Sequence, residues 1–314
     1  MSGAPRLFCL DTVLVDVVLR VAALPERAGD VLAHEQLITT GGGFNAMSAA
    51  ARQGLDVVYA GRLGVGPFAS RAERSLNDEH VATPVARNES LDTGICVVLV
   101  EPDGERSFVS SRGAEDTLRA SDLDALDVCA GDTVLVSGYN VMYGELAELV
   151  IAWLVQLPAE ITVAFDPATR MEDIPAVNLE TVLARTDWLI CNAREGATLA
   201  KNTDVFESAS SLATMSDRLN VLIRTGADGC VVATNHRVAT SVDGFATEVV
   251  DLNGAGDVHN GVFLAELAKG ESPYDAARWA NAAAAIAVSR FGPASGPTRE
   301  EVAAFVDRRE GRSA

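Results

Sequence analysis

The stretch DLNGAGD, residues 251–257, leads directly into residues 258–270, where apolar residues recur with the spacing of a helix. A helix that begins on a Gly-rich turn presents unpaired backbone N–H groups and the positive end of its dipole at one point. Small residues let an anion approach, so Gly254, Ala255 and Gly256 predict an anion site. Asp257 is an odd neighbour for an anion unless it takes a proton from a reacting group. The alternative is an ordinary Gly-rich turn with an Asp at the helix start.

The composition limits the class of protein. The chain has 314 residues, 48% of them hydrophobic, which is enough for one large α/β domain or two smaller ones. A net charge of −19 argues against binding to nucleic acid, whose phosphates attract basic patches. The N-terminal residues lack the pattern of a signal peptide, and no run approaches 18 apolar residues. We therefore expect a cytoplasmic protein without a membrane partner.

The five cysteines are odd in number, widely spaced and mostly set in apolar runs. This usage is typical of reduced thiols in the core of a cytosolic protein. The residues concerned are Cys9, Cys96, Cys129, Cys191 and Cys230.

Two early features carry polar residues in apolar surroundings. Asp16 lies within the apolar run Thr12–Val21, so it either ends a strand at a site or points outward to solvent. Gly41-Gly42-Gly43-Phe44-Asn45 opens an expected helix over residues 44–53. Its glycines permit positive φ and close approach of a ligand, and Asn45 offers both a donor and an acceptor. The alternative is a flexible hinge with Asn45 as helix cap.

The order of the elements predicts the fold class. Residues 94–100 and 106–111, joined by EPDGE, form the clearest β-hairpin. From Thr133 onward, short apolar strands alternate with helices, as in a parallel sheet covered on both faces. The sequence therefore predicts a three-layer αβα sandwich with a mostly parallel central sheet and a small antiparallel sheet from early segments.

These motifs resemble those of the ribokinase-like (PfkB) family of sugar kinases. The stretch 251–257 resembles the C-terminal signature of the family and the stretch 41–45 the N-terminal one, in the same order over nearly the full chain. The resemblance implies a single kinase domain spanning residues 1–314. Lid segments at about 14–43 and 94–113 would be inserted in it and would close over the sugar.

The resemblance also assigns roles to residues of the two signatures. Asp257 would be the catalytic base for the sugar hydroxyl that attacks the γ-phosphate of ATP, and the amides of Gly254, Ala255 and Gly256 would form the anion hole. The residues expected to bind the substrate are Asp16, Gly42, Gly43, Asn45 and Arg112.

Further residues would bind the nucleotide and the ions. Asn192-Ala193-Arg194-Glu195 resembles the family's Asn-x-x-Glu motif, in which Asn192 and Glu195 would organise Mg²⁺-bound water. On sequence alone these two residues are equally a helix cap and a surface helix residue. Asp251 and Ser295 resemble a monovalent-cation loop for K⁺. The expected nucleotide-binding residues are Asn192, Arg224, Gly226, Gly229 and Asn281.

The expected function is an ATP-dependent kinase for a hydroxyl of a small sugar or sugar acid, acting as a homodimer through the lid. Leu14 and Asp11 depart from the family's sugar-binding Asn and strand-end Gly, which makes ribose itself a poorer candidate. His259 is expected to pack on its helix. One alternative is a kinase of a nucleoside, pyrimidine or phosphosugar on the same fold. Another is a non-catalytic sensor that binds sugar or nucleotide.

Overall fold

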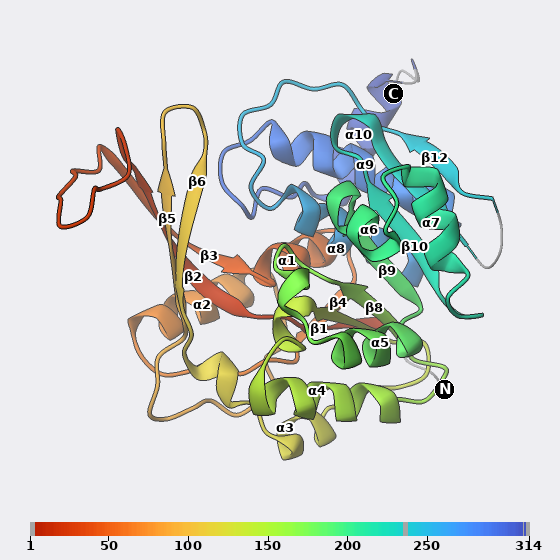
Figure 1. Ribbon diagram of the computed structural model, residues 1–314, viewed down its shortest axis with the longest axis horizontal. Helices are drawn as coiled ribbons and strands as arrows, with labels where there is room; N and C mark the ends of the chain where they lie inside the picture. Colours follow the sequence, from red (N-terminus) through yellow and green to blue (C-terminus); the bar gives the residue numbers. More distant parts are fainter. Residues whose placement is uncertain (1–3, 235–237, 310, 312–314) are drawn as a thin grey trace.

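The computed structural model describes residues 4–234, 238–309 and 311 and contains two sheets (Figure 1). The larger sheet has eight strands in the order β12-β11-β10-β9-β8-β7-β1-β4. Its six strands from β4 to β10 are parallel, and β11 and β12 add an antiparallel edge. The strands are β1 (Arg6–Leu10), β4 (Asp56–Tyr59), β7 (Thr133–Ser137), β8 (Thr162–Asp166), β9 (Trp188–Asn192), β10 (Asn220–Arg224), β11 (Gly229–Ala233) and β12 (Thr240–Asp243).

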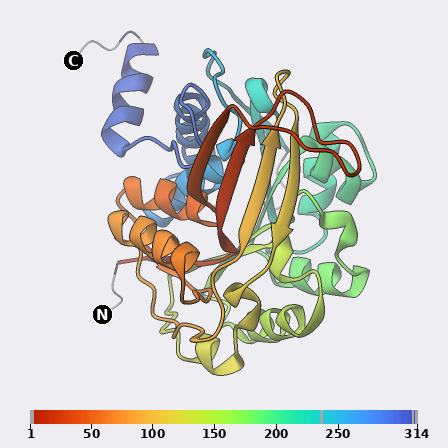
Figure 2. The ribbon, with the colours of Figure 1, turned by 90° about the vertical axis from the view of Figure 1, so that its left-hand side faces the viewer.

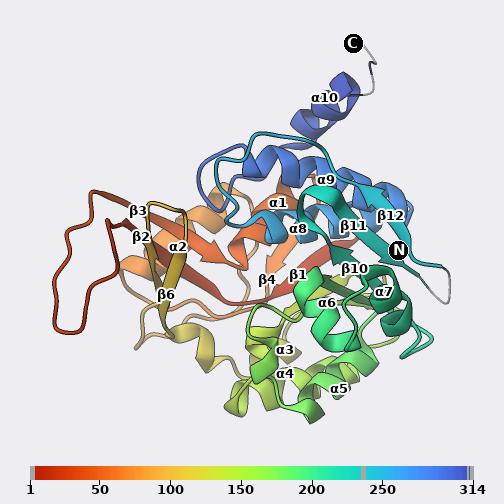
Figure 3. The same cartoon turned by 45° about the horizontal axis from the view of Figure 1, so that its top comes forward.

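Helices cover both faces of this sheet, which explains why its strands are continuous apolar runs. Side chains such as Val134, Val163 and Leu222 are fully buried. One face packs against α1 (Phe44–Arg52), α2 (Pro67–Asp78), α8 (Ala255–Ala268), α9 (Pro273–Val288) and α10 (Arg299–Arg309). The other packs against α3 (Ala120–Asp124), α4 (Gly144–Gln156), α5 (Ala176–Arg185), α6 (Ala193–Ala200) and α7 (Val205–Ala213). Figure 3 shows the two groups of helices on opposite sides, which confirms the predicted three layers.

The second sheet has four strands in the order β3-β2-β5-β6 and stands beside the main body (Figure 2). The predicted hairpin is confirmed as the antiparallel pair β5–β6. β2 and β5 run parallel, so the sheet is mixed, whereas an antiparallel sheet was expected. These two strands come from separate parts of the chain, and no hairpin turn sets their direction. The strands are β2 (Val13–Arg20), β3 (Glu35–Gly42), β5 (Ile95–Val100) and β6 (Arg106–Ser111).

These strands come from the segments expected to form the lid, and its closure over a substrate stays a prediction. The small sheet buries one face around Cys96, Val98 and Val100 and exposes the other. The ends of the expected 1–314 domain, like residues 235–237 and 310, lie outside the described residues. No helix of the described chain is long and apolar enough to cross a bilayer.

All five cysteines are free. Four of them are buried as expected, but Cys129 is exposed, so its assignment to the core was wrong. It lies in the loop before β7.

Helices α1 and α8 pack in direct backbone contact. A Cβ atom at Gly261 of α8 would lie 2.1 Å from the carbonyl oxygen of Ala46 in α1. This glycine therefore sets the separation of the two helices, because an oxygen of the helix backbone cannot rotate away as a side chain can.

Replacing Gly261 with alanine tests this contact. Alanine favours a helix by about 1 kcal/mol over glycine. We nevertheless expect Gly261→Ala to lower the free energy of unfolding by about 1–3 kcal/mol, because the added methyl group forces the helices apart. Urea denaturation followed by circular dichroism measures this change. Ser211→Ala, at an exposed position of α7, is the control and should leave stability nearly unchanged. Equal stability of Gly261→Ala and the wild type would contradict the contact.

Candidate active site

The two sequence motifs meet at the start of α8. Gly254 precedes the helix with φ +74°, and a Cβ atom there would lie 2.1 Å from the carbonyl oxygen of Pro293, so this turn requires glycine. Asp257 lies in the first turn of α8 and is partly buried. Its Oδ2 accepts a hydrogen bond of 3.0 Å from Nδ2 of Asn45, in α1. Residues 212 positions apart thus form one site.

The side chain of Asn45 does not cap its helix. Gly43 is the N-cap residue of α1, and no side chain caps that end. Asn45 is only 4% exposed, and its Oδ1 has no hydrogen-bond partner among the described residues. A buried amide oxygen without a partner is costly, so a donor from a ligand is expected to complete it. Nδ2 of Asn45 therefore orients Asp257, and Oδ1 of Asn45 offers an acceptor to a ligand.

The amides expected to form the anion hole lie at the start of α8, and the anion site itself stays a prediction. The first amides of a helix have no partner within the helix, which leaves N–H groups at the start of α8 for an anion. The Ala255 amide donates to the carbonyl oxygen of Leu252 at 3.4 Å, a long and weak bond. An arriving anion could replace such a bond at little cost.

Asp257 belongs to a group of carboxyl side chains that repel one another. Partial burial, together with the charge of Asp166, raises the pKa of Asp257 to about 6, although the hydrogen bond from Asn45 and the charge of Arg224 oppose this shift. Burial and the charge of Asp257 raise the pKa of Asp16 to about 6 and that of Asp11 to about 7. Such groups titrate together.

Asp16 does not point to solvent, because it is only 8% exposed. The glycine loop passes directly over it, and a Cβ atom at Gly41 would lie 2.2 Å from its Oδ2. Gly42 has φ +64°. A Cβ atom at Gly43 would lie 2.8 Å from the Cβ atom of Asp11. The loop therefore needs small residues because two carboxyl side chains lie beneath it.

A second polar network lies on the other side of Asp257. Arg224, at the end of β10, contacts Asp166 at 3.4 Å and donates to the carbonyl oxygen of Gly256 at 3.3 Å. It also donates to Oδ1 of Asn260, whose Nδ2 donates to Asp166 at 2.6 Å. Sequence reasoning missed Asp166 and Asn260. Asp166 could have been found, because it ends a predicted parallel strand, where sites of α/β proteins gather.

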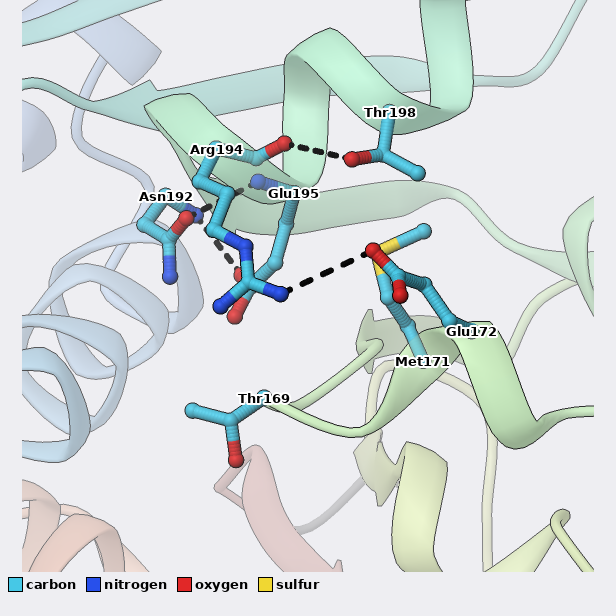
Figure 4. Close-up of a pocket in the computed structure, with 7 residues that line it drawn as sticks. All are labelled: Thr169, Met171, Glu172, Asn192, Arg194, Glu195 and Thr198. Carbon is cyan, nitrogen blue, oxygen red and sulfur yellow. Dashed lines mark hydrogen bonds and ion pairs between the residues drawn. The ribbon is translucent and has the colours of Figure 1, made fainter.

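Asn192 and Glu195 cap the start of α6, and their expected role in organising Mg²⁺-bound water stays a prediction. Oδ1 of Asn192 accepts from the Glu195 amide at 2.9 Å and Oε2 of Glu195 accepts from the Asn192 amide at 2.8 Å, which is a capping box. Glu195 is buried rather than on the surface, and burial and the charge of Asp166 raise its pKa. Figure 4 shows both residues lining a pocket that Arg194 and Glu172 bridge at 3.6 Å.

This pocket lies between the N-terminus of α6 and the loop after β8. Its volume of about 30 Å³ suits water molecules and is far too small for a nucleotide. The other lining residues are Thr169, Met171 and Thr198.

The residues expected at the nucleotide differ in their surroundings. Gly226 has φ +69° with open space beside it, so a ligand can approach its backbone. Gly229 has φ +99°, and a Cβ atom there would lie 2.2 Å from the carbonyl oxygen of Val242, which makes it a structural glycine. Asn281 is buried, and its Nδ2 donates to the carbonyl oxygens of Val242 and Asp243 at 3.0 and 3.1 Å. Its side chain is thus engaged within the protein, and its contact with adenine stays a prediction.

His259 is buried as expected and bonds to Asn281 at 3.0 Å through Nε2. The amide nitrogen of Asn281 already donates to backbone oxygens, so its Oδ1 accepts and Nε2 of His259 carries the proton. Burial, then the charge of Arg224, lowers the pKa of His259 to about 3. The ring is therefore neutral and structural at physiological pH.

The remaining predicted residues have hydrogen-bond partners other than Asp257. Arg112 is exposed and pairs with Asp116 at 2.8 Å. Oγ of Ser295 donates to the carbonyl oxygen of Ala287 at 3.1 Å. Asp251 pairs with Arg106 of β6.

Comparisons with known proteins agree on one family. A sequence model described as pfkB family carbohydrate kinase matches residues 4–300. The chain is 31% identical to an uncharacterized sugar kinase, YegV, of Escherichia coli strain K12, over 92% of this chain and 90% of that protein. It is also 31% identical to an ATP-dependent ribose-1-phosphate kinase of Halopiger xanaduensis, over 94% of this chain and 95% of that one.

Solved structures show the same fold. A ribokinase from Thermotoga maritima superposes with a TM-score of 0.83 at 24% identity, covering 96% of this chain and 99% of that one. A putative ribokinase II from E. coli, in complex with ATP and Mg²⁺, gives a TM-score of 0.83 at 21% identity, covering 97% and 99%.

Proposed function

Because the chain belongs to the pfkB family of carbohydrate kinases, we propose that it transfers the γ-phosphate of ATP to a hydroxyl of a small neutral sugar. The observation that carries this proposal is the pairing of Asn45 with Asp257. One atom of the Asn45 amide orients the carboxylate, and the other is a buried acceptor without a partner among the described residues. A sugar hydroxyl that donates to one of these two groups is placed beside the other.

The site residues would then share the work of transfer. Asp257 takes the proton of the sugar hydroxyl as its oxygen bonds to the γ-phosphorus of ATP. The bond from phosphorus to the bridging oxygen breaks, and ADP leaves. The amides at the start of α8 stabilise the charge that spreads over the transferring group, and Arg224 adds a positive charge beside Gly256. The raised pKa of Asp257 suits a base that works near neutral pH.

The residues present fit Mg²⁺ as the companion of ATP. Asp166 and Asn192, at the ends of the neighbouring strands β8 and β9, and Glu195, in the first turn of α6, offer hard oxygen ligands, and the charge of Asp166 contributes to the raised pKa of Glu195. Over the described residues, no three His, Cys, Asp or Glu side chains converge to hold a metal by themselves. Sparse ligation suits an ion that keeps its waters and is held by phosphates. When bound, it would neutralise phosphate charge.

Replacing the base tests the proposal. We expect Asp257→Asn to lower kcat by roughly 10²–10⁴, because the hydroxyl loses its proton acceptor while ATP binding does not involve this carboxylate. Initial rates of ADP release with saturating sugar and ATP measure the change. Asp275→Asn is the matched control, since Asp275 occupies the same place in the first turn of α9 but is exposed.

The pH dependence of kcat/KM tests the role of Asp257 independently. A base must be deprotonated, so kcat/KM of the wild type should fall as pH drops through about 6. The residual rate of Asp257→Asn should lack this step. A wild-type rate that stays constant down to pH 4.5, or near-normal activity of Asp257→Asn, would exclude Asp257 as the base.

The charge around the acceptor favours a neutral sugar. Asp11 and Asp16 lie beneath the glycine loop and are coupled electrostatically to Asp257. A phosphate or carboxylate on the acceptor would add a negative charge to this group. The second candidate acceptor is nevertheless a phosphosugar, because one relative is a ribose-1-phosphate kinase at 31% identity.

Removing the charge of Asp11 separates the two acceptors. We expect the wild type to phosphorylate neutral sugars in preference to sugar phosphates. Asp11→Asn should shift the ratio of the two kcat/KM values toward sugar phosphates by about tenfold, or ~1.4 kcal/mol. A panel of pentoses, hexoses, nucleosides and their phosphates, read by ADP release, measures both values in each protein. A wild type that prefers a sugar phosphate would overturn the neutral acceptor.

We also propose that two copies associate through the small sheet. Its edge strand β6 carries Phe108, 60% exposed, and Val109, 65% exposed, on opposite faces of the sheet. Apolar side chains on a strand edge favour association with another copy.

The oligomeric state tests this association. Light scattering at micromolar concentration should give the mass of a dimer, and Phe108→Asp should give a monomer because it places a charge in the interface. Phe206→Asp, at a 43% exposed phenylalanine on α7, should leave the mass unchanged. A monomeric wild type would contradict the proposal.

A further inference from the structure

The loop expected to hold a monovalent cation is already filled by protein groups. Asp251 is only 9% exposed at its side chain. Its Oδ1 accepts from the Asn253 amide at 2.9 Å and its Oδ2 from the Gly292 amide at 3.2 Å. The guanidinium of Arg106 also pairs with Oδ1. The hydroxyl of Ser295, the other expected ligand, donates to the carbonyl oxygen of Ala287. The residues present therefore do not fit K⁺.

The positive charge of Arg106 beside Asp251 disfavours the binding of a cation to this carboxylate. A K⁺ ion on Asp251 would lie beside a guanidinium, and like charges a few ångströms apart repel strongly in partly buried surroundings. A guanidinium stays charged at every physiological pH and makes directional hydrogen bonds, which a hydrated ion does not. Arg106 thus supplies the positive charge permanently.

We propose that Arg106 is a positioning residue that takes the place of the monovalent cation, so that this kinase is independent of K⁺. Asp251 begins the turn that ends at Gly254 and Asp257, and Arg106 fixes that turn through the carboxylate. The proposal rests on the proposed function only in that the turn serves phosphoryl transfer.

Arg106 belongs to one of the segments expected to form the lid. It lies on β6, the edge strand of the small sheet, whereas Asp251 precedes α8 in the main body. In Figure 1 the loop that leads into α8 runs beside the β5–β6 hairpin. A second contact supports this arrangement, because Arg20 of β2 lies over the ring of Phe291, 5.1 Å from its centroid. Phe291 precedes Gly292, which itself bonds to Asp251.

The small sheet therefore contacts Asp251 through Arg106 and the neighbouring segment at Phe291 through Arg20. The support that Arg106 gives to the turn would therefore depend on the position of the small sheet relative to α8.

Salt replacement together with Arg106→Gln tests this inference. Rates are measured at saturating Mg·ATP and sugar in KCl, CsCl or tetramethylammonium chloride at equal ionic strength. The wild type should vary by no more than about twofold among the three salts. Arg106→Gln should lose about tenfold in kcat, or ~1.4 kcal/mol, in tetramethylammonium chloride, with little change in KM for ATP. KCl should restore much of that loss, because the freed carboxylate can then take K⁺.

Arg27→Gln is the matched control, since it removes an exposed arginine from the loop between β2 and β3 and should behave as the wild type in every salt. Arg106→Lys keeps the charge and should remain independent of K⁺, and it serves if Arg106→Gln does not fold. Severalfold activation of the wild type by KCl would overturn the proposal. Arg106→Gln that matches Arg27→Gln, or that stays slow in KCl, would overturn it as well.

A binding measurement separates this inference from the proposed function. The melting temperature of the wild type should be the same in KCl and tetramethylammonium chloride, whereas that of Arg106→Gln should rise in KCl. Crystals soaked in Tl⁺ should show an anomalous peak at Asp251 in Arg106→Gln only. If no sugar were phosphorylated, the proposed function would fail, yet these two readouts would still decide whether Arg106 replaces the cation. A Tl⁺ peak at Asp251 in the wild type would overturn it.

Discussion

The hydrogen bond between Asn45 and Asp257 is the contact on which the site depends. A carboxylate in a partly buried position close to other acids tends to take up a proton, and its pKa rises accordingly. The amide of Asn45 and the start of α8 oppose that tendency by stabilising the charged form. The balance leaves a group that is a carboxylate at neutral pH and still basic enough to accept a proton. Neither α1 nor α8 provides this balance alone.

The fold follows from local patterns in the sequence to a large extent. Buried parallel strands are continuous apolar runs, so the residue pattern alone locates β7 to β10 and the helices between them. The parallel pairing of β2 with β5 has no such signature, because strand partners distant in the chain leave no local signal. The exposure of Cys129 was missed because the number and spacing of the cysteines do not reveal which of them other elements cover.

The sequence predicted single residues of the candidate site better than it predicted the contacts between them. The resemblance pointed to Asp257 and Asn45, but not to the hydrogen bond that joins them. Asp251 was expected to bind an ion, but its pairing with an arginine 145 positions away was not foreseen. Asn192 and Glu195 show that two interpretations need not compete, because a capping box fixes both side chains where a site needs them. Pairs of this kind depend on tertiary packing.

The backbone contact at Gly261 has a further consequence. It sets the distance between the helices that carry Asn45 and Asp257, so the hydrogen bond between these residues depends on packing in the hydrophobic core. The small sheet, in contrast, has its own core cluster and contacts Asp251 and Phe291 through the side chains of Arg106 and Arg20. The spacing of α1 and α8 therefore comes from the main body alone, whereas the turn before α8 also contacts a side chain of the small sheet. Exchange of residues in β6 can thus alter that turn while the packing of the two helices is inherited unchanged.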